Sequence, residues 1–396
     1  MLVASFLLAI TLIGCISQGV AFNRLVAYVT EELGKPLGKF APHVTVILPC
    51  KGLDPGFNEN VQKLLGQDYP SFEVIFAVAA KDDPAYANLV DLSKTSTLPI
   101  SIIVAGINQK RSQKINNQLK ALETLSPQTE VIVFVDSDVI ARPDFLRQLV
   151  APLQSEAVGV CTGYRFYIAS LRNWPSQLRS LWNRMSAWEM ANPDLAFAWG
   201  GAMAIRRSVF EKAKVAAAWD QAADDDLSLT TAVKEIGLSV HFVPQCLVAT
   251  DGDQSFSEII EWTNRQLILT KVYYPKLWQR AVARAAVMAL WLIGMTLALA
   301  LWLGAGDQSM SLALLAGLTI LPLELLFLVR ARGLWQKVLT GNSQYIQESF
   351  WTSCAAIPLA HVVLPWMTLF SVLTNRIQWR GVTYELLSPS ETLIIS

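Results

Sequence analysis

The sequence predicts an α/β fold, with a mostly parallel sheet flanked by helices, joined to transmembrane helices at the N-terminus and in the C-terminal third. Three observations predict this architecture. The 396 residues are 53% hydrophobic and only 16% charged, against about 25% charged residues in a typical soluble domain. Uncharged segments long enough to cross a bilayer lie towards both ends of the chain. Between them, short apolar runs alternate with amphipathic stretches.

The charge balance and the cysteines exclude several classes of protein. Lys and Arg number 32 and Asp and Glu also number 32, so no positive excess is available to displace the counterions of a nucleic acid, and no nucleic-acid partner is expected. The apolar excess excludes intrinsic disorder. The five cysteines and three histidines are scattered without the spacing of a zinc site. We therefore expect reduced thiols that face a cytosol.

Residues 1–23 contain no charged side chain and fit one transmembrane anchor. A cleaved signal peptide would have a basic first region, which this segment lacks. The stretch Leu12-Ile13-Gly14-Cys15 faintly resembles a lipoprotein cleavage box, but the same lack of Lys and Arg argues against it. We therefore expect an uncleaved anchor.

Residues 285–375 are expected to form a C-terminal membrane region. The stretches 285–306 and 308–329 predict an antiparallel pair of spans. Glu324 is the one charged residue within these two stretches. The stretch 349–375 is also uncharged, but two prolines interrupt it, and proline frees backbone groups that must be satisfied inside the protein. A kinked span and a segment that dips in and returns are both consistent with this pattern.

Basic residues near the span ends predict the orientation. They fall on one side of the membrane if the first three spans alternate: Arg24, Lys35, Lys39, Arg280, Arg284, Arg330, Arg332 and Lys337. The segment between the spans is then cytoplasmic, in an integral membrane protein. A fourth crossing would place Arg376 and Arg380 outside, so we favour a dip and return at 349–375 and a cytoplasmic tail at 376–396.

Residues 42–250 carry the pattern of a cytoplasmic α/β domain. The expected strands are Val44–Leu48, Phe72–Ala80, Ile100–Ala105 and Val131–Val135, and the expected helices cover 57–67, 84–94 and 112–125. β-branched runs that alternate with helical patterns predict a parallel sheet covered by helices. Ligands of such sheets bind beyond the carboxyl ends of the strands. Acidic residues at those places are therefore candidates for function.

Asp136 and Asp138 follow the strand Val131–Val135 and point to the same side. Paired carboxylates at a strand end suit a hard divalent cation and, through it, a diphosphate. An Asx-type turn that caps the strand explains them equally well. The spacing alone favours neither interpretation.

Two further acidic groups begin helices. Asp82-Asp83 precedes Pro84, which is the arrangement of a helix N-cap; a cap is also a rigid platform for a ligand. Asp224-Asp225-Asp226 opens the helix expected at Leu227–Ile236. One aspartate there is favourable for the helix by about 0.3–1 kcal/mol, but three exceed that need because like charges repel. A carboxylate held near other acids can be tuned as a general base.

Seven short blocks together resemble the inverting, membrane-bound glycosyltransferases of the family-2 kind, and within them the ceramide glucosyltransferases. The blocks, with a similar tail, are Lys51-Gly52 with Asp54-Pro55, Gln67-Asp68-Tyr69-Pro70, Asp82-Asp83-Pro84-Ala85, Lys114-Ile115-Asn116-Asn117, Asp136-Ser137-Asp138, Gly200-Gly201, Asp225-Asp226 and the tail Trp379-Arg380-Gly381…Tyr384. The resemblance covers roughly residues 42–385 and implies a GT-A-like fold. Motifs of P-loop, Rossmann, zinc-protease and serine-hydrolase chemistry are absent from the sequence.

The resemblance implies a role for each matching residue. Asp82 and Asp83 would contact the uracil and ribose of a UDP-sugar, and Asp136 and Asp138 would hold the diphosphate, Asp138 through Mg²⁺ or Mn²⁺. The remaining implied residues are Lys51, Lys114 and Asn117 for the donor, Asp226 with Asp225 as the catalytic base, and Trp199, Gly200 and Gly201 at the acceptor end.

One stretch departs from the resemblance. The related enzymes usually carry (Q/R)-x-x-R-W on an interfacial helix after the base, where the Arg-Trp pair would help to hold the leaving diphosphate and the acceptor. Here Arg265 keeps the first position, but Ile268-Leu269 replaces the pair. Either Arg265 or Lys271 substitutes for it, or catalysis is impaired.

The expected reaction moves one sugar, glucose in the first place, from a UDP-sugar to the hydroxyl of a membrane lipid such as ceramide, with inversion. Aromatic and basic residues in 254–280 suit a helix at the bilayer interface, although an ordinary packing helix would also fit the pattern. Two alternatives stay open: a processive polysaccharide synthase and a non-catalytic nucleotide-sugar-binding membrane protein.

Overall fold

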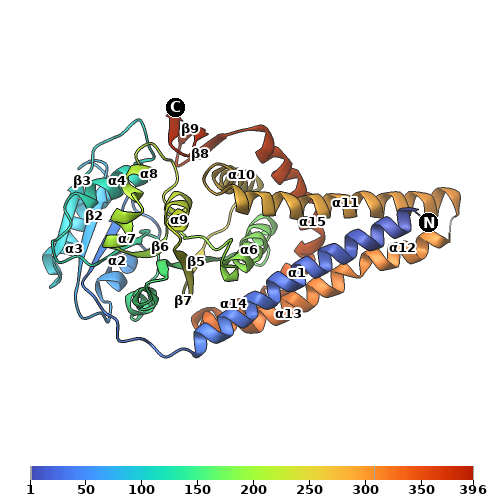
Figure 1. Ribbon diagram of the computed structural model, residues 1–396, viewed down its shortest axis with the longest axis horizontal. Helices are drawn as coiled ribbons and strands as arrows, with labels where there is room; N and C mark the ends of the chain where they lie inside the picture. The colour runs from blue at the N-terminus through green and yellow to red at the C-terminus, as the bar shows by residue number, and fades with distance from the viewer. Residues whose placement is uncertain (1, 307, 396) are drawn as a thin grey trace.

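The computed structural model describes residues 2–306 and 308–395. An α/β domain forms one end of the molecule, and a bundle of long helices projects from it (Figure 1). Four helices are long and apolar enough to cross a membrane: Leu2–Gly34, Pro275–Gly304, Met310–Val338 and Phe350–Leu373. The five cysteines are unpaired. The division into an α/β part and a part made of long apolar helices is therefore visible in the arrangement of the elements.

The chain folds into ten strands and fifteen α-helices within the described residues. The strands are β1 (Val44–Pro49), β2 (Phe72–Val78), β3 (Ile100–Val104), β4 (Val131–Val135), β5 (Val158–Ile168), β6 (Ala202–Arg206), β7 (Ser239–Asp251), β8 (Arg376–Trp379), β9 (Val382–Ser388) and β10 (Glu391–Ile394). The helices of the domain are α2 (Phe57–Leu65), α3 (Pro84–Thr95), α4 (Gln113–Leu122), α5 (Phe145–Val150), α6 (Trp174–Ser186), α7 (Arg207–Lys212), α8 (Val215–Ala218), α9 (Asp226–Glu235) and α10 (Phe256–Tyr273). The remaining helices are α1 (Leu2–Gly34), α11 (Pro275–Ala305), α12 (Ser309–Leu318), α13 (Ile320–Val338), α14 (Ser343–Glu348) and α15 (Phe350–Leu373).

The large sheet has seven strands in the order β3-β2-β1-β4-β6-β5-β7. All neighbouring pairs are parallel except those of β6, which runs antiparallel to β4 and β5. The four expected strands and the helices expected between them are confirmed to within a few residues at their ends. Strand order reverses between β1 and β4, and such a switch point opens a crevice at the carboxyl ends of the strands.

The period-two alternation of the strands sends side chains into two cores. Val131, Val133 and Val135 of β4 pack with α2, α3 and α5 on one face. Ile132 and Phe134 pack with α4, α7 and α9 on the other face. The sheet is therefore covered on both sides, which explains why its strands are continuously apolar.

The stretch that was expected to dip in and return is one continuous helix, α15. Residues 350–373 form one continuous helix that includes both prolines. At its start, Phe350 lies under the guanidinium of Arg332, 4.7 Å from ring centre to Cζ, and just past its end Thr374 accepts a hydrogen bond from Lys271 (2.7 Å). α15 packs on α11, and a cavity between the two helices is lined by Ala285 and Ala289 of α11 and by Val362 of α15. Both ends of α15 therefore lie at the domain end of the bundle (Figure 1).

Several expected boundaries also differ. The single amphipathic helix expected at 254–280 is two helices, because α10 ends at Tyr273 and Pro275 begins α11, which runs on to Ala305. A proline favours the first turn of a new helix, where its missing N–H leaves no bond unmade. The tail at 376–396 contains a small antiparallel sheet, β10-β9-β8. Ile377, Tyr384 and Leu386 of that sheet are buried in the same core as α9 and α10.

Candidate active site

A polar cleft with an empty volume of about 1870 Å³ lies at the carboxyl ends of β1 and β4. Its walls come from distant parts of the chain: β5, the loop before β6, the start of α9, the end of β7, α10 and the β8–β9 turn. The predicted residues that line it are Lys51, Lys114, Asn117, Asp136, Asp138, Trp199, Gly200, Gly201, Asp225, Asp226 and Arg265. Residues that are remote in sequence therefore meet where the strand order reverses.

Three predicted residues do not line this cleft. Asp83 caps α3, and its Oδ1 accepts hydrogen bonds from the N–H groups of Ala85 and Gly52, both at 2.9 Å. Asp82 beside it is exposed to solvent. Lys271 donates hydrogen bonds to the carbonyls of Ser371 (2.5 Å) and Thr374 (2.7 Å) at the end of α15. The cap interpretation of Asp83 is therefore confirmed, and Lys271 binds the C-terminal end of α15.

Asp136 and Asp138 bind cationic side chains. Lys114 Nζ lies 2.9 Å from Asp136 Oδ1. Arg165 donates two hydrogen bonds to Asp138, at 2.6 and 2.8 Å, in a bidentate pair. This pairing outweighs burial and lowers the pKa of Asp138, whereas burial raises the pKa of Asp136 despite Lys114. Each of these two carboxylates is thus paired with a cationic side chain.

The three successive aspartates before α9 each have a different partner. Asp224 Oδ1 accepts the N–H of Leu227 (2.8 Å) and caps the helix. Asp225 receives Lys114 Nζ at 3.0 Å and Gln118 Nε2 at 2.9 Å. Asp226 accepts the N–H of Gly200 at 2.7 Å. All three line the cleft, and each has its own partner: one accepts an N–H of the helix, one binds a lysine and one accepts the N–H of Gly200.

The environment of Asp226 makes it a weak acid near neutrality. Burial and, after it, the charge of Asp225 raise the pKa of Asp226 to about 6. Burial also raises the pKa of Asp224, which is hydrogen-bonded to Asp226. A carboxylate with a pKa near the working pH, in a cleft, fits a general base.

Glycine is required at position 200 because the side chains of Lys114 and Asp225 approach its Cα closely. A Cβ at this position would lie 2.8 Å from Lys114 Nζ and 3.0 Å from both carboxylate oxygens of Asp225. Lys114 also donates a hydrogen bond to the Gly200 carbonyl (3.1 Å). Any side chain at Gly200 would therefore displace the lysine that joins β4 to α9.

Several cleft residues were missed from the sequence. Arg165 lies on β5, a strand that was not predicted, and its guanidinium stands over the ring of Trp199 at 5.0 Å. Arg179 of α6 lies 4.0 Å above the ring of Tyr167 and donates to the carbonyl of Gly252 (2.7 Å). The available signal was an arginine within the otherwise apolar run that ends β5, because a buried charge needs a partner.

The match of a family model to most of the chain shows the class of protein: a glycosyltransferase, built here as an α/β domain with apolar helices attached to it. The chain belongs to glycosyl transferase family 21, whose sequence model matches residues 6–391. The resemblance to glycosyltransferases seen in the sequence is thereby confirmed.

Two curated relatives are named ceramide glucosyltransferase. That of Gibberella zeae is 27% identical over 138 residues, which is 32% of this chain and 26% of the relative. Ceramide glucosyltransferase 1 of Caenorhabditis elegans is 25% identical over 115 residues, 29% of this chain and 24% of the relative. The matched part thus spans about a quarter of the length of these relatives.

Among solved structures, a mannosyltransferase from Pyrobaculum calidifontis in complex with GDP-Man and Mn²⁺ has a TM-score of 0.48 and 17% identity. The match covers 93% of this chain and 98% of that chain. Glucosyl-3-phosphoglycerate synthase from Mycobacterium tuberculosis has a TM-score of 0.38 and 14% identity, covering 58% and 78% of the two chains.

Proposed function

We propose that this glycosyltransferase moves one hexose, glucose in the first place, from a UDP-sugar to the hydroxyl of a membrane lipid such as ceramide, with inversion. One observation carries the proposal. Asp138 and Asp226 line one cleft, and α10, which forms a wall of that cleft, leads directly into the apolar helix α11. A hydroxyl held at the membrane surface would thus meet a soluble donor at these carboxylates.

In the proposed reaction, Asp226 takes the proton of the acceptor hydroxyl while that oxygen attacks the anomeric carbon. The bond from this carbon to the UDP oxygen breaks in the same step, and the electron pair leaves with the diphosphate. The N–H of Gly200 fixes the orientation of the Asp226 carboxylate. A single in-line displacement inverts the anomeric centre, and no covalent enzyme intermediate is needed.

The donor set fits a divalent cation only together with a substrate phosphate. The described residues contain no group of three or more His, Cys, Asp or Glu side chains that could hold a metal. Mg²⁺, however, is usually bound through one or two carboxylates plus substrate phosphates, and Asp138, with Asp136 beside it, would supply these. A bound Mg²⁺ or Mn²⁺ would neutralise charge on the leaving diphosphate as a Lewis acid.

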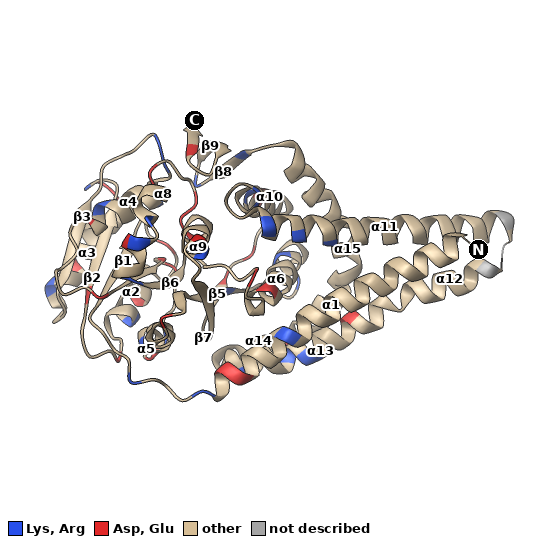
Figure 2. Ribbon diagram, viewed as in Figure 1, with Lys and Arg blue, Asp and Glu red and all other residues tan. Residues whose placement is uncertain are grey.

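We further propose that the bundle crosses a bilayer and that the catalytic domain is cytoplasmic. Lys and Arg lie towards the domain end of the bundle, whereas its far end carries few charges (Figure 2). Arg380 contacts the β1 loop of the domain (3.0 Å to the Lys51 carbonyl), so the tail lies on the same side as the domain. The positive-inside rule then favours a cytoplasmic domain.

The test is to incubate membranes containing the protein with several labelled UDP-sugars and lipid acceptors, and to analyse the products. One sugar on a lipid supports the proposal. A polymer would indicate a processive synthase, and no product with any pair would indicate a non-catalytic binding protein. Asp138→Ala and Asp226→Asn serve as the inactive controls, and the anomeric configuration of the product tests inversion.

A further inference from the structure

The turn between β8 and β9 places an arginine in an unusual conformation at the edge of the cleft. Trp379 pairs with Val382, so Arg380 and Gly381 form a two-residue turn, with φ angles of 48° and 82°. Asn-Gly and Gly-Gly are the favoured sequences of such turns, because both positions need positive φ. An arginine at the first position is strained, and strained residues cluster at functional sites.

The turn is fixed to the loop after β1 and, through Asp54 of that loop, to the loop that carries Asp136 and Asp138. Arg380 donates to the carbonyl of Lys51 (3.0 Å) and to Asp54 Oδ1 (3.3 Å). Asp54 in turn accepts the hydroxyl of Ser137 at 2.6 Å. Because Ser137 stands between Asp136 and Asp138, the turn and the aspartate loop are connected through a single carboxylate.

A second guanidinium accompanies Arg380. Arg265 of α10 stands over the ring of Trp379 at 5.8 Å and donates to the carbonyl of Gln378 (3.3 Å). Arg265, Trp379 and Arg380, here called the hairpin cluster, all line the cleft. Among the described residues, Arg265 has no carboxylate within ion-pair distance. A half-buried guanidinium with a neutral partner is costly unless an anion joins it.

The deeper cations of the cleft are already engaged. Lys114 is shared by Asp136 and Asp225, and Arg165 is bound to Asp138. The helix α10 adds no further positive charge one turn after Arg265, because Ile268 and Leu269 stand there, buried in the core at 0% and 5% exposure. Among the cations that line the cleft, Lys51, Arg179 and Arg265 have no carboxylate of the described residues within ion-pair distance, and Arg380 shares Asp54 with Ser137. The hairpin cluster contributes two of these four cations and is joined through Asp54 to the loop of Asp136 and Asp138.

We propose that the hairpin cluster binds the diphosphate of the nucleotide donor, with Arg380 and Arg265 as its ligands and the strained turn as the device that aims Arg380 into the cleft. This inference rests on the proposed function. It also explains how the chain functions without an Arg-Trp pair on α10, since the C-terminal hairpin brings a tryptophan and an arginine to the same cleft.

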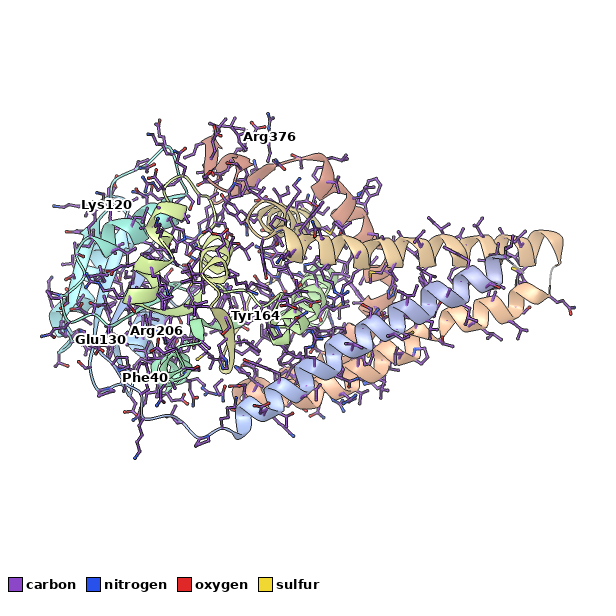
Figure 3. All side chains as sticks on the ribbon, viewed as in Figure 1. Phe40, Lys120, Glu130, Tyr164, Arg206 and Arg376 are labelled. Atoms are coloured by element: carbon purple, nitrogen blue, oxygen red, sulfur yellow. The ribbon has the colours of Figure 1, made fainter. Side chains whose placement is uncertain are left out.

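The test measures UDP and uridine binding to the purified full-length protein with Mg²⁺ present. Arg380→Asn removes the guanidinium and its bonds to Lys51 and Asp54, but asparagine suits positive φ, so the two effects offset each other and the melting temperature should change little. UDP binding should weaken about 10- to 100-fold, as for the loss of a charged hydrogen bond, and uridine binding should not change. Arg265→Gln should behave in the same way. Arg376→Asn is the matched control, because Arg376 pairs with Glu385 at the outer edge of the same sheet (Figure 3).

The outcomes separate this inference from the proposed function. Unchanged UDP binding in both variants overturns the role of the cluster but not the proposed function. An equal loss of UDP and uridine binding would indicate a structural role of the cluster and overturns the same inference. Failure of the unmodified protein to bind UDP overturns both proposals. A selective loss of UDP binding in Arg380→Asn and Arg265→Gln, with Arg376→Asn unaffected, supports the inference.

Discussion

Asp226→Asn is expected to abolish transfer and at the same time to stabilise the fold at neutral pH. The pKa of Asp226 is raised from 3.8 to about 6, first by burial and then by Asp225. Between about pH 4 and pH 6 the native state therefore binds more protons than the unfolded state, so stability falls as the pH rises through this window. At about 1.4 kcal/mol per pKa unit, a shift of about two units costs about 3 kcal/mol above pH 6.

The asparagine removes this cost, yet its amide oxygen can still accept the N–H of Gly200. We expect the variant to be more stable than the unmodified protein at pH 7.5, by about 3 kcal/mol, with the difference vanishing near pH 4. The assay is thermal unfolding in detergent at a series of pH values, in parallel with transfer. Asp91→Asn, at an exposed pair with Lys94 (2.7 Å), is the control and should stay within about 0.5 kcal/mol. A variant that transfers sugar normally, or that melts at or below the unmodified protein at pH 7.5, would refute the reasoning.

Three other perturbations test the cleft. Asp138→Ala should abolish transfer and destabilise the protein by roughly 3–5 kcal/mol, because Arg165 loses its bidentate partner in a buried site. EDTA should stop transfer by the unmodified protein without that loss of stability, and added Mg²⁺ or Mn²⁺ should restore transfer. Lys114→Met should lower the melting temperature by a similar free energy, because the two carboxylates that it bridges then repel each other, and equal melting curves would contradict this. Gly200→Ala should cost about 1–3 kcal/mol through overpacking, whereas Gly34→Ala, with no atom within 4 Å of the new Cβ, should have little effect on unfolding.

The parallel half of the sheet could be predicted because its signals are local. β-branched runs form β1 to β4, and Asp83 with Pro84 begins α3 where a cap was expected. The strands β5 to β7 were not predicted. Their runs contain glycine, arginine and proline, and their pairing, with β6 antiparallel between β4 and β5, depends on tertiary contacts that no local pattern encodes.

Fold class, apolar helices and most of the acidic cleft follow from the sequence itself, because hydrophobic periodicity and strand-end carboxylates act over a few residues. The balance of charge within the cleft follows only from the tertiary structure. Arg165 meets Asp138 from another strand, and Arg380 reaches the Lys51 carbonyl across 329 positions of the chain. Electrostatic pairing depends on distance in space, and folding alone brings such remote groups together.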